Sequence, residues 1–172
     1  MATLATERLT LRPLIAGDVP ALQLFWNDPE VRRYLWENQE LSTEAVAEIV
    51  VQSETCFRDL GAGFFAMELL SQPGELAGFC GYRRFEDSDQ PELLYGILPE
   101  FWGQGFATEA ARAVLQFGFE SCGMSCVIAA TDTPNQRSVQ VLQRLGMSFR
   151  ERREYHGLDT VFYGLANEEF SV

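Results

Sequence analysis

The sequence has little of several residue types, and each shortage excludes a class of protein. It contains one histidine, His156, and four cysteines, none of which forms a Cys-x-x-Cys pair. Metal sites built from cysteine and histidine need such spacings, so we expect no metal. Lysine and arginine together number 13 against 25 acidic residues, which gives a net charge of −12. That charge does not attract a phosphate backbone, so we expect no nucleic-acid partner.

Long apolar runs, repeats and linkers are also missing. No stretch approaches the ~20 apolar residues of a membrane-spanning helix, and the first residues lack the basic start and apolar core of a secretory signal. We therefore expect a cytoplasmic protein with no membrane association and with reduced core cysteines. The length fits a single domain over residues 1–172. The acidic surface either keeps the protein soluble or attracts cationic substrates.

Changes in apolar periodicity predict a mixed α/β fold. A strand ends near Leu11, Asp18 is placed to cap a short helix, and a longer helix runs from Ser42 or Thr43 to Gly61. Three strand-like runs follow, over residues 63–70, 75–86 and 91–98. The first two are joined by "SQPGE", whose Pro-Gly pair is a turn signal, and together the three predict an antiparallel meander. The full expected order is β-αα-βββ-α-β-α-ββ, with helices packed against a largely antiparallel sheet.

Two glycines, Gly103 and Gly105, stand directly before a predicted helix in "FWGQGFATEA". The first amides of a helix lack intrahelical partners and carry partial positive charge, and glycines let the backbone approach an anion closely. A pyrophosphate would fit there, although a plain turn explains the pattern equally well. The lysine and hydroxyl pair of a P-loop and the third glycine of a dinucleotide fingerprint are both absent. An anion site here would therefore bind a phosphate-bearing ligand in a way that differs from both the P-loop and the dinucleotide-binding motif.

The same stretch, "LPEFWGQGFATEA", closely resembles the cofactor-binding motif of the GNAT N-acetyltransferases. The branch it resembles is the RimJ/RimL type, the ribosomal-protein N-terminal acetyltransferases. Further motifs of that branch follow in its order and spacing: "TERLTLRPL", "WNDPEVRRYL", "ELAGFCGY", "TDTPNQRSVQVLQRLGM" and "YHGLDTVFYGL". The resemblance covers almost the whole chain. It implies the GNAT fold, a twisted sheet of six to seven strands that splays at its central strands, flanked by about four helices.

The resemblance also implies the substrates. Acetyl-CoA would be the donor, and the acceptor would be a primary amine, either a peptide N-terminus or a small amine. The pantetheine arm would pair with the strand edge of Tyr95, Gly96 and Ile97, with a bulge at Gly96 producing the splay. The pyrophosphate would lie on the amides of Gly103, Gln104, Gly105, Phe106, Ala107 and Thr108. A homodimer is compatible with the family.

Acetyl transfer to an amine needs a base, an oxyanion stabiliser and a proton for the leaving thiolate. The N–H of Ile97 is the candidate oxyanion donor. Glu92, at the start of the same strand, is the candidate base, because many family members keep a carboxylate on this strand. It could equally be a solvated residue at a strand end.

The element N-x-x-S supplies two further candidates. Asn135 could cap the following helix, bind the pantetheine, or do both. By resemblance, Ser138 faces the CoA sulfur and protonates it, whereas a serine in a first helical turn can also serve only the backbone. Some family members have a tyrosine acid and a glutamate base at the positions of Leu142 and Ala130. Their absence is the main support for the alternative function, a non-catalytic acyl-CoA sensor or binding module.

Aromatic and acidic residues after the first helix are the candidate acceptor site. Trp26, Tyr34, Trp36 and Glu37 combine rings with a carboxylate, which suits an ammonium group. In the family this region forms one wall of the acceptor site, although packing on short helices would explain the same residues. His156 is a further candidate at a predicted hairpin tip, where exposed histidines are common.

Overall fold

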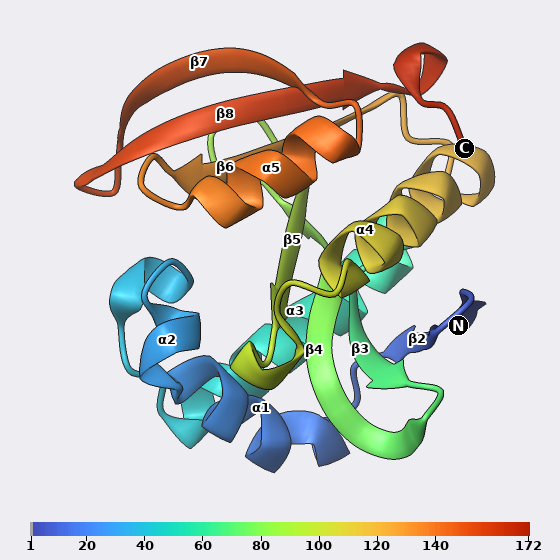
Figure 1. Cartoon of the computed structure of the whole chain (residues 1–172), viewed down its shortest axis with the longest axis vertical. Helices are drawn as coiled ribbons and strands as arrows, with labels where there is room; N and C mark the ends of the chain where they lie inside the picture. The colour runs from blue at the N-terminus through green and yellow to red at the C-terminus, as the bar shows by residue number, and fades with distance from the viewer. Residues whose placement is uncertain (1) are drawn as a thin grey trace.

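The computed structural model of the protein describes residues 2–172, which are built on one eight-stranded sheet (Figure 1). The strands are β1 (Leu4–Ala5), β2 (Leu9–Pro13), β3 (Phe64–Leu69), β4 (Gln72–Arg84), β5 (Pro91–Ile97), β6 (Cys126–Asp132), β7 (Ser148–Tyr155) and β8 (Leu158–Ala166). Their order in the sheet is β1-β2-β3-β4-β5-β6-β8-β7. Across residues 2–172 every neighbouring pair is antiparallel except β5 and β6.

In the described part of the chain, five α-helices flank the sheet. They are α1 (Val19–Asn27), α2 (Pro29–Arg32), α3 (Thr43–Leu60), α4 (Phe106–Gln116) and α5 (Gln136–Arg144). Helix α3 begins where the sequence predicts, because the Ser42 side chain accepts the amide of Ala45 at 3.1 Å. It ends at Gly61, whose φ of 80° is the left-handed conformation typical of a helix end. After α4 the chain continues through a π-helical turn, Phe117–Ser121.

The helices cover both faces of the sheet, so the central strands are buried on both sides. On β3, Phe64 and Ala66 pack with the apolar side chains of α1 and α3. The alternate residues Phe65 and Met67 pack with those of α4 on the other face. Since successive side chains of a strand point to opposite faces, this strand reads as a continuous apolar run.

The predicted fold class and the meander of β3, β4 and β5 are confirmed, with differences in detail. The sheet has eight strands instead of six or seven, because Leu4–Ala5 adds a two-residue strand. The expected turn at "SQPGE" is displaced: the chain turns at Leu70–Ser71, and Pro73 and Gly74 lie within β4. The β3–β4 register shifts there, so the Pro-Gly pair forms an irregularity in a strand and not the connection itself.

Asp18 does not cap α1 with its side chain. Its carboxylate instead accepts two hydrogen bonds from the Arg12 guanidinium, at 2.8 and 2.9 Å, and one from the amide of Ile15 at 2.9 Å. Asp18 is therefore a buried ion-pair partner of the first long strand, although it stands at the N-cap position.

Candidate active site

The sheet splays between β5 and β6. In residues 2–172 these strands share a single pair, Glu92 with Ile128. Figure 1 shows β5 running down the middle of the molecule, with β6 and β8 lying together above it. The amide of Leu98, directly after β5, donates to the carbonyl of Ala77 in β4. Because amides of a strand alternate in direction, those of Tyr95 and Ile97 point the other way, into the gap.

The splay is not produced by a bulge at Gly96, which corrects the sequence-based expectation. The β4–β5 register is regular from Pro91 to Ile97. Gly96 has a packing reason instead: a Cβ there would lie 3.1 Å from the Phe79 ring and 3.4 Å from the Phe25 ring. The gap follows from the lost pairing of β5 with β6, and its edge can accept an extended ligand with amide groups.

The two glycines of the turn are both left-handed, with φ of 73° at Gly103 and 82° at Gly105. Nothing lies within 4 Å of a Cβ built on Gly103, so its backbone angle alone favours glycine. Gly103, Gln104 and Gly105 are exposed, and α4 begins immediately at Phe106. The amides of Phe106, Ala107 and Thr108 stand in its first turn, where helix geometry leaves them without intrahelical acceptors. An anion such as a pyrophosphate fits this end.

Trp102 joins the turn to the splayed strand. Its indole N–H donates to the carbonyl of Ile97 at 2.8 Å, and the guanidinium of Arg137 on α5 lies 4.5 Å from the ring centroid. The Ile97 carbonyl is thereby satisfied, while the Ile97 amide still points into the gap. Trp102 thus fixes the spacing between the turn and the free strand edge.

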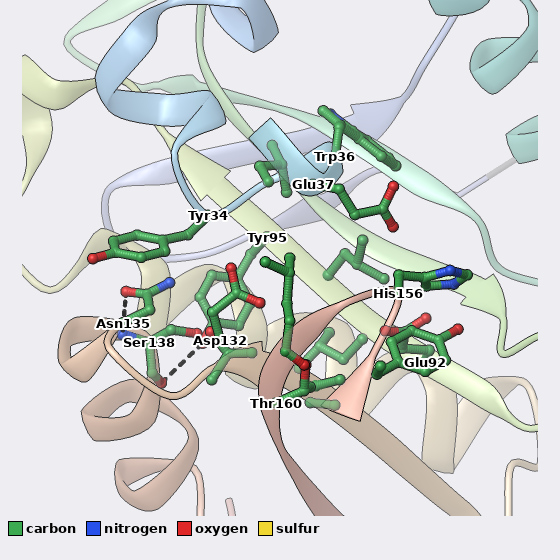
Figure 2. Close-up of a pocket in the computed structure, with 18 of the residues that line it drawn as sticks. Tyr34, Trp36, Glu37, Glu92, Tyr95, Asp132, Asn135, Ser138, His156 and Thr160 are labelled. Carbon is green, nitrogen blue, oxygen red and sulfur yellow. Dashed lines mark hydrogen bonds between the residues drawn. The ribbon is translucent and has the colours of Figure 1, made fainter. Parts of the chain in front are cut away.

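A pocket opens beside the gap, walled by the segment after α2, by β4, β5 and β6, by the start of α5 and by the β7–β8 turn (Figure 2). Its wall contains most of the candidates named from the sequence: Tyr34, Trp36, Glu37, Glu92, Tyr95, Asn135, Ser138 and His156. Segments far apart in the sequence are thus brought to one cavity. Leu142 and Ala130, which stand where other family members have a tyrosine and a glutamate, also line it.

One end of the pocket carries two hydroxyl groups. The Tyr95 hydroxyl lies 2.8 Å from the Ser138 hydroxyl and 3.1 Å from the Ser138 carbonyl. Asn135 caps α5, since its side chain accepts the Ser138 amide at 3.3 Å. Burial raises the pKa of Tyr95 above its ordinary value, so this hydroxyl stays protonated. The sequence provides no reason to expect this tyrosine side chain beside Ser138, because it comes from β5 and not from α5.

Glu92 lies at another part of the pocket wall and is almost fully buried, with 2% of its surface exposed. It faces Arg83 across the β4–β5 ladder, and the Arg83 Nε donates to its carboxylate at 2.7 Å. It is therefore not a solvated residue at a strand end. As a base, Glu92 would have to accept a proton at the expense of this ion pair.

Two other carboxylates of the pocket have no cationic partner. Glu37 and Asp132 both line it, and within residues 2–172 neither forms a salt bridge. Burial raises the pKa of Asp132 above its ordinary value, and the charge of Glu37 raises it further. Figure 2 places Asp132 between the Ser138 end and Thr160. Asp132 was not among the candidates, although a lone acidic residue ending a buried strand was a usable signal.

Two of the three aromatic candidates line the pocket, and the third packs behind them. Tyr34 and Trp36 line the pocket, whereas Trp26 is fully buried and does not reach it. The Trp26 ring packs edge-on against Trp36, with centroids 5.1 Å apart, and against Phe79 at 5.3 Å. Direct contact of Trp26 with an acceptor is thus excluded by its burial, and its contribution is to hold Trp36 in place.

The backbone of the same wall is unusual. Trp36, Glu37 and Asn38 have φ values of 52°, 53° and 58°, the left-handed region that non-glycine residues rarely adopt. Three such residues in succession cost free energy, of order 1–2 kcal/mol each. Strain of this kind is often found at ligand sites. Here it accompanies the placement of Glu37 on the pocket wall.

His156 stands at the β7–β8 turn, with φ of 51°, and lines the far side of the pocket. Its Nε2 lies 3.3 Å from a carboxylate oxygen of Glu86, in the loop between β4 and β5. The imidazole therefore links two loops at the pocket rim.

Metal ligands, cysteines and apolar helices complete the description of residues 2–172. Residues 2–172 contain no group of three or more histidine, cysteine, aspartate or glutamate residues arranged to hold a metal ion. The four cysteines are free, and Cys80 is fully buried. No helix in this part of the chain is long and apolar enough to cross a membrane.

Comparison with known proteins identifies relatives of this fold. The chain is 26% identical to the uncharacterized N-acetyltransferase p20 of Bacillus licheniformis, over 99% of both chains. It is 27% identical to the spermidine N(1)-acetyltransferase of Escherichia coli, over 84% of this chain and 75% of that one. A solved structure of RimL, a ribosomal L7/L12 alpha-N-protein acetyltransferase in complex with coenzyme A, superposes with a TM-score of 0.80. It is 20% identical, with 96% of this chain and 98% of that chain covered, and thus shows likeness of fold.

The family itself is shown by a direct match. Residues 8–148 match the family described as the acetyltransferase (GNAT) domain, which is most of the chain. Members of this family use acetyl-CoA, and the named relatives are N-acetyltransferases. The chain therefore belongs to the GNAT family of acetyltransferases and is an N-acetyltransferase.

Proposed function

We propose that this protein transfers an acetyl group from acetyl-CoA to a primary amine that carries positive charge. The observation that carries the proposal is the pair of carboxylates, Glu37 and Asp132, that line the pocket without a cationic partner in residues 2–172. The charge of Glu37 raises the cost of ionising Asp132, and a bound ammonium removes that cost. The rings of Tyr34 and Trp36 on the same wall favour a cation as well.

The free edge of β5 and the turn before α4 would hold the co-substrate. Tyr95 and Ile97, on either side of Gly96, offer backbone groups for the pantetheine arm, and the amides from Gly103 to Thr108 offer donors for the pyrophosphate. Acetyl-CoA, when bound, supplies a thioester that an amine can attack. The Ile97 amide, which points into the gap, is the candidate donor to the oxygen on which charge develops.

Asp132 is the better placed of the two candidate bases. It has no salt bridge to break, and its raised pKa makes it a stronger proton acceptor than an ordinary aspartate. Glu92, the candidate from sequence, is held by Arg83 at 2.7 Å. We assign to Asp132 the removal of the ammonium proton, and to Glu92 the neutralisation of Arg83 beneath the pocket.

Ser138 is the candidate acid at the thiol end. When the Tyr95 hydroxyl donates to the Ser138 Oγ across their 2.8 Å contact, the Ser138 proton is free to point to a leaving sulfur. This arrangement needs neither a tyrosine at position 142 nor a glutamate at position 130. It therefore accounts for a functional site with Leu142 and Ala130 in those places.

The acceptor has two candidate chemistries. The spermidine N(1)-acetyltransferase relative acts on a polyamine, which suits an acidic pocket. The RimJ/RimL branch that the sequence motifs resemble points instead to the N-terminus of a ribosomal protein, and the similar RimL is an alpha-N-protein acetyltransferase of ribosomal L7/L12. The unpaired carboxylates favour the small polycation, and a basic peptide N-terminus is the second candidate.

The test is thiol release from acetyl-CoA with a panel of amines. The panel holds a polyamine, an amino sugar, a neutral amino acid, and peptides with basic and acidic starts. We expect turnover with the polyamine or the basic peptide, weakened by salt because the attraction is electrostatic. Preference for the neutral or acidic acceptors would contradict the proposal. Tight CoA binding in calorimetry without turnover on any amine would indicate an acyl-CoA sensor instead.

A further inference from the structure

The segment between β1 and β2 reaches across the molecule to the start of α4. The Thr6 hydroxyl donates to the Glu109 Oε1 at 2.6 Å, and the backbone amide of Arg8 donates to the same oxygen at 2.9 Å. The Arg8 guanidinium binds the other oxygen, with Nε at 2.7 Å and Nη2 at 2.6 Å. One carboxylate in the first turn of α4 is thus held by four donors from the "TERL" motif.

Arg8 also touches the glycine turn itself. Its Nη1 donates to the carbonyl of Gln104 at 2.9 Å, and its guanidinium lies 4.3 Å from the centroid of the Phe106 ring. A Cβ built on Gly105 would lie 3.5 Å from the Arg8 Nη2. A single side chain therefore holds residues 104–106, which carry the amides proposed to bind the pyrophosphate.

The charges explain why this arrangement matters for an anionic ligand. Glu109 lies in the turn whose amides would face the phosphates, and its unpaired carboxylate would repel them. Burial by itself would raise the pKa of Glu109, but the hydrogen bonds from Thr6 and Arg8 outweigh it and lower the pKa. Glu109 therefore stays ionised, and Arg8 both neutralises it and draws it toward the N-terminal segment.

We propose that Arg8 and Glu109 form a positioning clamp that sets the glycine turn for the pyrophosphate of acetyl-CoA. The inference rests on the proposed function, because it requires acetyl-CoA as the ligand of that turn. Neither residue touches the reacting atoms. Both act through the backbone of Gln104 to Phe106, so they should govern co-substrate binding and leave the chemical step unchanged.

The experiment compares two acyl donors in the full-length protein. Acetyl-CoA carries the pyrophosphate, and acetyl-pantetheine lacks it. We expect Arg8→Ala to raise KM for acetyl-CoA and the Kd of CoA about tenfold, the worth of a charged hydrogen bond. KM for acetyl-pantetheine should stay within about twofold of wild type, because this donor lacks the pyrophosphate. The kcat with saturating acetyl-CoA should also stay within about twofold, because neither clamp residue touches the reacting atoms.

A double variant distinguishes the electrostatic effect of the Glu109 charge from a purely structural role of the clamp. In the Arg8→Ala background, Glu109→Gln removes the unpaired negative charge, so CoA affinity should recover by about threefold or more at low salt. If the clamp only joined β1–β2 to α4, the second substitution would not restore affinity. Arg58→Ala is the matched control, since Arg58 is 73% exposed and pairs only with surface residues.

Two results would overturn the clamp. One is unchanged CoA affinity in Arg8→Ala, and the other is equal impairment with acetyl-CoA and acetyl-pantetheine, which indicates general damage. Thermal unfolding of each variant identifies a folding defect. If Arg8→Ala has one, Arg8→Lys replaces it, and because lysine keeps the charge, the clamp predicts a CoA affinity between those of wild type and Arg8→Ala. Failure of the wild-type protein to bind CoA would instead refute the proposed function.

Discussion

The hydroxyl oxygens of Tyr95 and Ser138 lie 2.8 Å apart and join β5 to the first turn of α5. This contact bridges the two elements on either side of the splay. A tyrosine on the central strand thereby reaches the serine that the family resemblance places at the CoA sulfur. The two hydroxyls are candidates to act as one unit in proton donation.

We predict that Ser138→Ala lowers kcat by about 10- to 100-fold, at or below the usual effect of removing a general acid. KM for acetyl-CoA should change little. Tyr95→Phe should have a smaller effect, and the double variant should resemble Ser138→Ala because the residues share one function. Steady-state kinetics measures all three.

A matched control is Tyr82→Phe. The Tyr82 hydroxyl is buried and donates to the Val114 carbonyl at 2.9 Å, away from the pocket. Its loss should reduce stability without changing kcat. Full activity in Ser138→Ala would show that solvent, and not this hydroxyl, protonates the thiol.

The pH profile distinguishes the two candidate bases. Asp132 must be ionised to accept a proton, so kcat/KM should fall as the pH drops through its pKa, which burial and Glu37 hold above the ordinary value. Asp132→Asn should lower kcat/KM by about 100-fold and remove this acidic limb. Glu92→Gln should retain the limb and mainly destabilise the protein, because it leaves Arg83 without its partner. The opposite pattern would make Glu92 the base.

Local signals in the sequence predicted the elements well. Ser42 and Asn135 were expected at helix starts, and both accept the amide three residues on. The left-handed angles of Gly103 and Gly105 likewise fit the turn predicted there. Each of these features depends on a few neighbouring residues, which is why a single sequence suffices to predict them.

Features that depend on tertiary pairing were not predictable in the same way. The sequence leaves Glu92 as either a candidate base or a solvated strand-end residue, and only the β4–β5 register places it opposite Arg83. Trp26 is aromatic, like the residues of the acceptor wall, but it lies on the face of α1 that packs against Phe79 of β4, and this packing buries Trp26. The sequence shows Asp132 as a lone acidic residue at the end of a predicted strand, but its position in the pocket depends on where β6 lies relative to β5.

Glu37 should control both acceptor binding and the titration of Asp132. Glu37→Gln removes a charge that raises the pKa of Asp132, so the acidic limb of kcat/KM should move to lower pH. KM for a cationic amine should rise about 3- to 10-fold at low salt, the effect of about one exposed charge pair. A limb that does not move would show that the two carboxylates are not coupled.

Glu37→Gly tests the strain of the same wall. Glu37 has φ of 53°, which glycine adopts without penalty, so this variant should gain up to about 1 kcal/mol of stability. It should still bind cationic acceptors as weakly as Glu37→Gln does. Chemical denaturation and acceptor kinetics measure the two effects, and a glycine variant that loses stability would argue against strain at this position.

Asp18 should contribute stability that disappears in acid. Its carboxylate is buried and accepts bonds from Arg12 and the Ile15 amide. Burial alone would raise the pKa of Asp18, but these bonds outweigh it and lower the pKa. A group with a lowered folded pKa stabilises above its unfolded pKa of about 3.9 and loses that effect as the pH falls through the folded value.

Asp18→Asn should therefore reduce the free energy of unfolding by about 2 kcal/mol at pH 7, the range for a buried charged hydrogen bond. As the pH falls below about 4 toward the lowered folded pKa, the difference from wild type should shrink, because the carboxyl of the unfolded chain is protonated first and that of the folded protein follows. Urea denaturation at several pH values measures both. The control is Asp59→Asn, since Asp59 is 44% exposed and contacts Arg58 at 3.4 Å. That variant should change stability by under about 0.5 kcal/mol. An equal loss at pH 7 and at pH 3 would mean that Asp18 stabilises the fold by packing and not by its charge.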